Sequence, residues 1–251
     1  MIIIFINLCL ISSTIYSIEP ITTSVITGVV AKFGGASLFL HIGEYNGNAI
    51  AVTKRKALTA LHGHGKVNDV VTLVNSHGTE LKGKVCFCRY ELNKVDMAVI
   101  VLDGGVPDFT VHVPICVTRV VHGQKLLVLG KVYMDELLED FVTEAQVMVI
   151  GSESTLFRSS YQCDSGLSGA GIMVVPNKSG ECHVVGVHVG ANDDTVEAPP
   201  IKKMKSGAAD ADSVSSHTNS LAHSLHGHTA YCLICEAVRV DGLMDELNKS
   251  V

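Results

Sequence analysis

The feature that most constrains the fold is a succession of about a dozen short apolar segments, rich in β-branched residues and separated mostly by Gly, Asn or Asp. Many short strands without crossover helices cannot build a parallel sheet. The sequence therefore predicts an all-β protein of two antiparallel six-stranded barrels, with little helix before residue 200. The expected strands are residues 26–33, 37–43, 48–53, 56–60, 69–75, 80–88 and 96–102 before Pro107, and 109–116, 124–132, 142–150, 154–161, 171–175 and 183–190 after it.

The same pattern divides the chain into four parts. We expect an N-terminal barrel over residues 21–106, a C-terminal barrel over 107–197, and a linker with a His- and Cys-containing tail over 198–251, where the composition turns to Pro, Ser, Ala and charge. Residues 1–20 are first apolar and then rich in Ser and Thr. They are interpreted as a signal peptide or a membrane-anchor remnant, because the apolar run is short for a membrane span.

The charge balance bears on the kind of partner. Apolar residues make up 47% of the 251 residues, charged residues 18%, and the net charge is −6. Since there is no long basic run, nucleic acid is not expected as the main partner.

Two segments before Pro107 supply a histidine and a carboxylate. Residues 57–65, "ALTALHGHG", place His62 at the edge of a strand in a Thr-Ala-x-His frame, whereas His64 falls after a glycine and outside that frame. Asp96 opens an alternating apolar strand 34 residues later. A buried carboxylate there can accept the His62 Nδ1–H and stabilise the imidazolium.

The stretch "YQCDSGLSGAG", residues 161–171, contains two serines that each precede a glycine. In acyl transfer, the N–H groups of the nucleophile and of the residue two before it face the developing oxyanion, and glycine suits the earlier position. That residue is Gly166 for Ser168 but Cys163 for Ser165. Ser168 is therefore the expected nucleophile, and Ser165 an expected turn residue.

With these motifs, residues 24–197 resemble the chymotrypsin-like serine proteases, and more closely their viral branch (3C-like, sobemovirus-like and arterivirus-like). The resemblance rests on Thr59-Ala60-Leu61-His62, Asp96-Met97-Ala98, Gly166-Leu167-Ser168-Gly169 and Gly186-Val187-His188-Val189-Gly190. It implies a His62-Asp96-Ser168 triad with the Gly166 and Ser168 N–H groups as oxyanion hole, and it requires no cofactor.

The last motif bears on specificity. In the viral branch, a Gly-x-His stretch forms a wall of the S1 pocket, and its histidine donates to a substrate Gln or Glu. By resemblance His188 has this role, with Gly190 and Cys163 in the same pocket. Cys163 departs from the family, which often has a threonine donor there, and Asp164-Ser165-Gly166 copies a trypsin signature, which keeps Ser165 open as an alternative nucleophile.

The tail carries four possible zinc ligands, His226, His228, Cys232 and Cys235. Their spacing is tighter than in common zinc fingers, so no metal is expected.

The sequence thus predicts a serine endopeptidase that acts on polypeptides, processes a viral polyprotein after Glu or Gln, and has Glu197-Ala198 as a candidate self-cleavage bond. The expected location is membrane-associated, through the N-terminal segment, or cytoplasmic in the host cell. The alternatives are a secreted trypsin-like protease of a cellular organism and a catalytically silent two-barrel binding protein.

Overall fold

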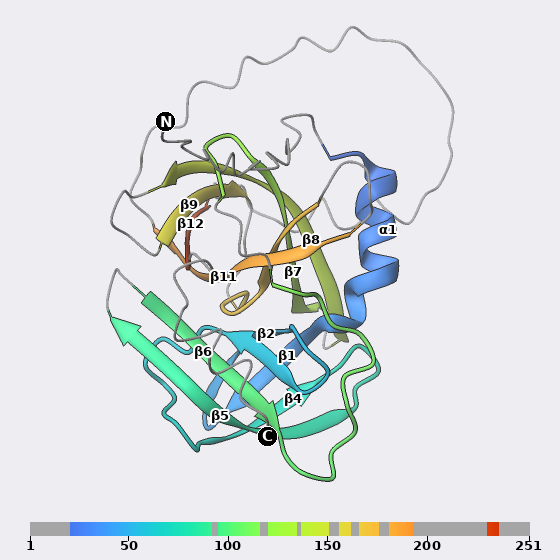
Figure 1. Cartoon of the computed structure of the whole chain (residues 1–251), viewed down its shortest axis with the longest axis vertical. Coiled ribbons are helices and arrows are strands. Elements are labelled where there is room, and N and C mark those ends of the chain that lie inside the picture. Colours follow the sequence, from blue (N-terminus) through green and yellow to red (C-terminus); the bar gives the residue numbers. More distant parts are fainter. Residues whose placement is uncertain are drawn as a thin grey trace, which may run out of the picture.

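The computed structural model describes residues 21–91, 95–115, 120–134, 137–150, 156–161, 166–175, 181–192 and 230–235. Their regular secondary structure consists of strands, apart from one helix and one 3-10 turn near the start (Figure 1), and no helix among the described residues has the length and apolarity to cross a membrane. The elements are α1 Thr23–Phe33, η1 Gly34–Ala36, β1 Ser37–Ile42, β2 Tyr45–Ala51, β3 Lys56–Thr59, β4 Val70–Val74, β5 Glu80–Glu91, β6 Val95–Leu102, β7 Lys125–Met134, β8 Leu137–Ile150, β9 Leu156–Tyr161, β10 Gly171–Val174, β11 His183–Asn192 and β12 Ala230–Cys235.

The first sheet is a closed antiparallel barrel with the strand order β1-β2-β3-β6-β5-β4. Its members match the segments predicted from alternating and apolar runs between residues 37 and 102. Leu40, Leu58 and Ile100 are fully buried inside it, as expected for strands whose inward faces share one core. The predicted all-β class and this six-stranded barrel are confirmed.

The strand predicted over residues 26–33 is wrong, because these residues lie in helix α1. Thr22 caps the helix by accepting the Val25 N–H at 3.4 Å. Val29 and Phe33 are buried and Ile26 packs against them, which is a spacing of three and four residues that suits a helix. In Figure 1 the helix lies beside β8, and the Ile21 N–H just before it donates to the Glu144 carboxylate of that strand at 2.9 Å.

The second sheet has the strand order β10-β11-β12-β9-β8-β7, and β10 also pairs with β7. Its sixth strand is β12, from residues that the sequence analysis assigned to a tail outside the C-terminal barrel. Figure 1 shows β12 between β11 and β9, where its six residues pair with Leu156–Tyr161. The boundary predicted at residue 197 therefore leaves out one strand of this sheet.

The strand predicted over residues 109–116 is also wrong in the part that is described, residues 109–115. Instead of entering a ladder, this segment crosses between the sheets. The Phe109 N–H donates to the Lys54 carbonyl at 2.8 Å, and the Val113 N–H to the Ala51 carbonyl at 2.9 Å. On its other side, the Pro114 carbonyl accepts the Val184 N–H at 2.8 Å. Prolines lack the N–H that a ladder needs, which is consistent with this path.

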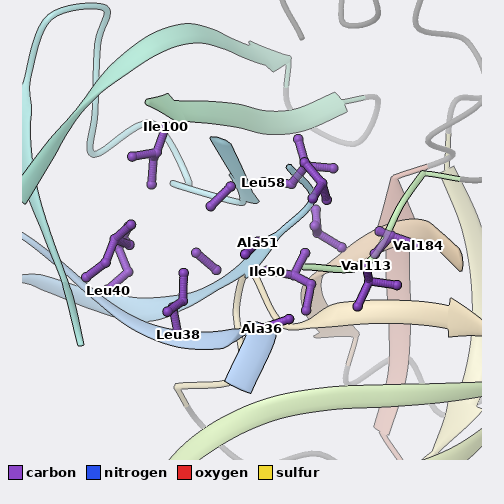
Figure 2. Close-up of a cluster of buried hydrophobic side chains, with 14 of the residues drawn as sticks. Ala36, Leu38, Leu40, Ile50, Ala51, Leu58, Ile100, Val113 and Val184 are labelled. Atoms are coloured by element: carbon purple, nitrogen blue, oxygen red, sulfur yellow. The ribbon is translucent and has the colours of Figure 1, made fainter. Parts of the chain in front are cut away.

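The main apolar core is continuous from the first barrel into the second sheet. Figure 2 shows Val113 and Val184 beside Ile50 and Ala51, on the side of the barrel that faces the second sheet. The same cluster includes Leu127, Leu129, Met173 and Val187 from the second sheet, whereas a separate cluster lies inside that sheet.

The two sheets are in direct backbone contact where β2 meets the residues before β10. The Asn48 N–H donates to the Ser168 carbonyl at 2.6 Å. Gly169 follows with a φ of +88°, and a Cβ added there would lie 1.9 Å from the Asn48 carbonyl oxygen. Only glycine combines this backbone conformation with so close an approach.

We predict that Gly169→Ala lowers the free energy of unfolding by about 1–3 kcal/mol, because the new methyl group separates the sheets and strains the backbone. The matched control is Gly28→Ala in α1, where an added Cβ meets nothing within 4 Å. This change should raise the free energy of unfolding by about 1 kcal/mol, because alanine favours a helix. Urea unfolding measures both, and equal effects of the two variants would contradict the prediction.

Candidate active site

His62 is held at one end of the first barrel by the backbone around it. It follows the end of β3, which pairs with β6 at Thr59 and Ala98, so the residues after β3 come close to the start of β6. The N–H groups of Leu61 and His62 donate to the two carboxylate oxygens of Asp96, each at 3.0 Å. These bonds fix the His62 backbone at a φ of 48°, an uncommon conformation for a residue other than glycine.

The side chains of His62, Asp96 and Ser168 come together at the junction of the two sheets. His62 Nδ1 lies 2.6 Å from Asp96 Oδ2, and His62 Nε2 lies 2.7 Å from Ser168 Oγ. Asp96 is buried, whereas the His62 side chain is 31% exposed. An imidazole placed in this way can accept the serine proton while the carboxylate stabilises the resulting positive charge.

Ser168 lies in a glycine-flanked turn that is tied to β11. Gly166 has a φ of +95°, a conformation that favours glycine. The Gly169 N–H donates to the His188 carbonyl at 2.7 Å, and the His188 N–H to the Ala170 carbonyl at 2.8 Å. The turn that carries the serine is thereby held next to the strand that carries His188.

His188 is buried and bonded to a tyrosine that the sequence analysis did not identify. Its Nδ1 lies 2.6 Å from the Tyr161 hydroxyl, which comes from the end of β9. Burial, with a smaller electrostatic contribution from His62, lowers the pKa of His188 to about 3. The ring is therefore neutral at ordinary pH. If the tyrosine donates to Nδ1, the His188 proton is on Nε2. Gly190 lies in the same strand, with open space where a Cβ would be.

Tyr45, at the start of β2, is a second aromatic residue of the site that no sequence pattern indicated. Its hydroxyl donates to the Ala60 carbonyl at 3.1 Å, and burial raises its pKa. Its ring meets His62 edge-on at 5.9 Å between centroids and stacks on His64 at 5.0 Å. His64 thus packs against Tyr45, and His62 is the histidine that lies at the Ser168 hydroxyl.

Other residues named from the sequence fall elsewhere. Cys163, Ser165, Glu197, His226 and His228 lie outside the described residues, and Cys232 and Cys235 lie in β12. Within the described ranges, no three or more His, Cys, Asp or Glu side chains gather closely enough to hold a metal ion.

No protein-family model and no curated protein sequence matches this chain. Solved structures match its fold. An inactive form of Rv3671c from M. tuberculosis H37Rv, with a serine replaced by alanine, has a TM-score of 0.56 at 14% identity, covering 94% of this chain and 100% of that one. A second inactive form of the Rv3671c protease gives 0.56 at 16%, covering 92% and 98%. A human pathogenic astrovirus serine protease gives 0.45 at 22%, covering 63% and 84%. The structural neighbours are chymotrypsin-like serine proteases, and the likeness to the first two shows that this chain shares their fold.

Proposed function

We propose that the protein is a serine endopeptidase whose two sheets correspond to the two barrels of a chymotrypsin-like protease. The observation that carries the proposal is the chain of short contacts from Asp96 through His62 to Ser168, at 2.6 and 2.7 Å. Ser168 is the nucleophile, His62 the general base and acid, and Asp96 the group that orients His62 and balances its charge. No cofactor is required for this chemistry.

The proposed reaction has two steps. Ser168 Oγ attacks the scissile carbonyl carbon and loses its proton to His62 Nε2, and the N–H groups of Gly166 and Ser168 stabilise the negative oxygen of the tetrahedral intermediate. His62 then protonates the leaving amine, which departs and leaves an acyl-enzyme. Water then attacks the acyl carbon and loses a proton to His62; the bond to Ser168 Oγ breaks, His62 returns the proton to Oγ, and the carboxylic acid is released.

A catalytically silent binding protein is the alternative from another class. A binding protein has no need for a partly exposed His62 ring within hydrogen-bond distance of the Ser168 hydroxyl across two sheets, so this contact favours the peptidase. Labelling with a fluorophosphonate separates the two functions, because only an activated serine reacts.

For the substrate, we propose cleavage after Gln or Glu in a polyprotein of viral origin. The support is a buried, neutral His188 whose Nδ1 is engaged by Tyr161, so that Nε2–H can donate to a carboxamide or carboxylate oxygen. An apolar or basic side chain would leave this buried donor unpaired. A secreted trypsin-like protease remains the alternative, and a preference for Lys or Arg would favour it.

The proposed location depends on residues 1–20. A membrane-anchor remnant there implies a membrane-associated protein of the host cell or a cytoplasmic one within a polyprotein, and a signal peptide implies secretion. The amino-terminal sequence of the mature protein distinguishes these possibilities.

Self-cleavage at Glu197-Ala198 would not simply separate a tail from the C-terminal barrel, because β12 follows this bond and belongs to the second sheet. This bond lies in the sequence between β11 and β12. Cleavage would therefore cut the chain between two strands of the second sheet. We expect β12 to remain attached through its pairing with β9 and β11.

The first prediction from this proposed function concerns the nucleophile. Ser168→Ala should lower turnover by about a million-fold, as expected for loss of a triad serine. Ser165→Ala should retain most activity, because Cys163 and not glycine lies two residues before Ser165. Peptidase assays and fluorophosphonate labelling of both variants check this. An active Ser168→Ala protein with an inactive Ser165→Ala protein would overturn the assignment.

The second prediction concerns the pocket. His188→Ala should lower the ratio of kcat/KM for a P1 Gln peptide to that for its P1 Leu analogue by at least about tenfold. In the wild type this ratio should be constant from pH 5 to pH 8. A pKa lowered to about 3 means that His188 takes up a proton only in strong acid, below this window. A step in the ratio near pH 6.5 would show that His188 titrates normally and would contradict the prediction.

The third prediction concerns the candidate self-cleavage bond. Purified wild type should give two denatured masses that correspond to a break after Glu197, whereas Ser168→Ala should give one. Under native conditions the two fragments should elute together, because β12 stays paired. Identical denatured masses for the two proteins would exclude cleavage.

A further inference from the structure

Asn48, in β2, is a buried polar residue whose entire side-chain amide is bonded to the other half of the molecule. Nδ2 donates to the Gly166 carbonyl at 2.7 Å and to the Lys131 carbonyl at 3.0 Å. Oδ1 accepts the Lys131 N–H at 2.5 Å. Both amide protons are therefore used, and the orientation of the amide is determined because the two carbonyls need donors and the N–H needs an acceptor.

The backbone of Asn48 adds two contacts, one toward each half of the proposed active site. Its N–H donates to the Ser168 carbonyl at 2.6 Å, and its carbonyl accepts the Thr59 hydroxyl at 2.6 Å. Thr59 ends β3, three residues before His62. A single residue thus connects the segment that carries the base to the turn that carries the nucleophile.

Gly166 needs such an external restraint. A Cβ at this position would meet nothing within 4 Å, so the space where a side chain would lie is open, and glycine itself allows many conformations. The Gly166 carbonyl is held by the Asn48 side chain and the Ser168 carbonyl by the Asn48 backbone. Both residues whose N–H groups form the proposed oxyanion hole are therefore fixed from one point in the opposite sheet.

We infer that Asn48 is a positioning residue that holds the Gly166–Ser168 turn in the conformation that binds the oxyanion; the inference rests on the proposed peptidase function. Asn48 touches no reacting atom and acts through Gly166 and Ser168. Its contribution therefore appears when the substrate carbonyl becomes tetrahedral, and it is small when the substrate first binds.

The test is Asn48→Asp, which keeps the shape of the side chain and the acceptor for the Lys131 N–H. It turns a carboxylate oxygen toward the Gly166 and Lys131 carbonyls, where a donor is needed. We expect kcat to fall by about 100-fold or more, as for the loss of an oxyanion-hole donor, with KM within about threefold of the wild type.

A pair of inhibitors separates positioning from a general structural role. A peptide aldehyde forms a tetrahedral adduct with the serine, whereas the alcohol of the same sequence binds only as a ground-state ligand. Asn48→Asp should weaken the aldehyde by about 100-fold and the alcohol by less than about threefold. Equal weakening of both inhibitors, or of neither, would overturn the inference.

The matched control is Asn75→Asp, in the turn between β4 and β5, where the side chain accepts the N–H groups of His77 and Thr79 and a carboxylate can do the same. It should leave kcat and both inhibitors unchanged. If Asn48→Asp does not fold, Thr59→Val is the second variant. It replaces with a methyl group the hydroxyl that contacts the Asn48 carbonyl at 2.6 Å and the Ala60 carbonyl at 3.2 Å, and it should weaken the aldehyde more than the alcohol. A wild type that resists fluorophosphonate would overturn the proposed function itself, whereas a labelled wild type with an unchanged inhibitor ratio in these variants would overturn the role of Asn48 alone.

Discussion

The hydrogen bond from the Asn48 N–H to the Ser168 carbonyl, 2.6 Å long, joins the two sheets at the candidate active site and constrains how its halves can be arranged. The first barrel carries His62 and Asp96, and the turn before β10 carries Ser168, so no local structure can align the three. The close approach of Gly169 to Asn48 and the apolar core that continues between the sheets make that bond possible. Alignment of the site is thus a property of the interface between the sheets.

Burial has opposite consequences for the two polar groups at this interface. Asp96 is buried but receives N–H bonds from Leu61 and His62 and lies beside the His62 ring, so its charge is compensated. His188 is buried with Tyr161 as its side-chain partner in the hydrogen bonds described, and burial lowers its pKa to about 3. Asp96 is therefore suited to balance a positive charge on His62, and His188 is suited to remain neutral and donate a hydrogen bond.

The fold shows where local patterns were insufficient. Residues 26–33 are β-branched and apolar, yet a cap at Thr22 and burial of Val29 and Phe33 on one face make them a helix. Residues 109–115 have the composition of a strand but bond to the backbones of both sheets instead. The second sheet is completed by β12, after more than thirty intervening residues, because strand pairing depends on proximity in space and not on sequence separation.

The sequence by itself determined the all-β class, most strand positions and the order of His62, Asp96 and Ser168, because alternation of apolar residues and short motifs are local signals. Only the tertiary structure decided how His62 reaches the serine across two sheets, that Tyr161 meets His188, and that Asn48 joins both halves of the site. These contacts link residues 27, 106 and 118 positions apart. Such pairings follow from how two sheets pack, and no local sequence pattern encodes that packing.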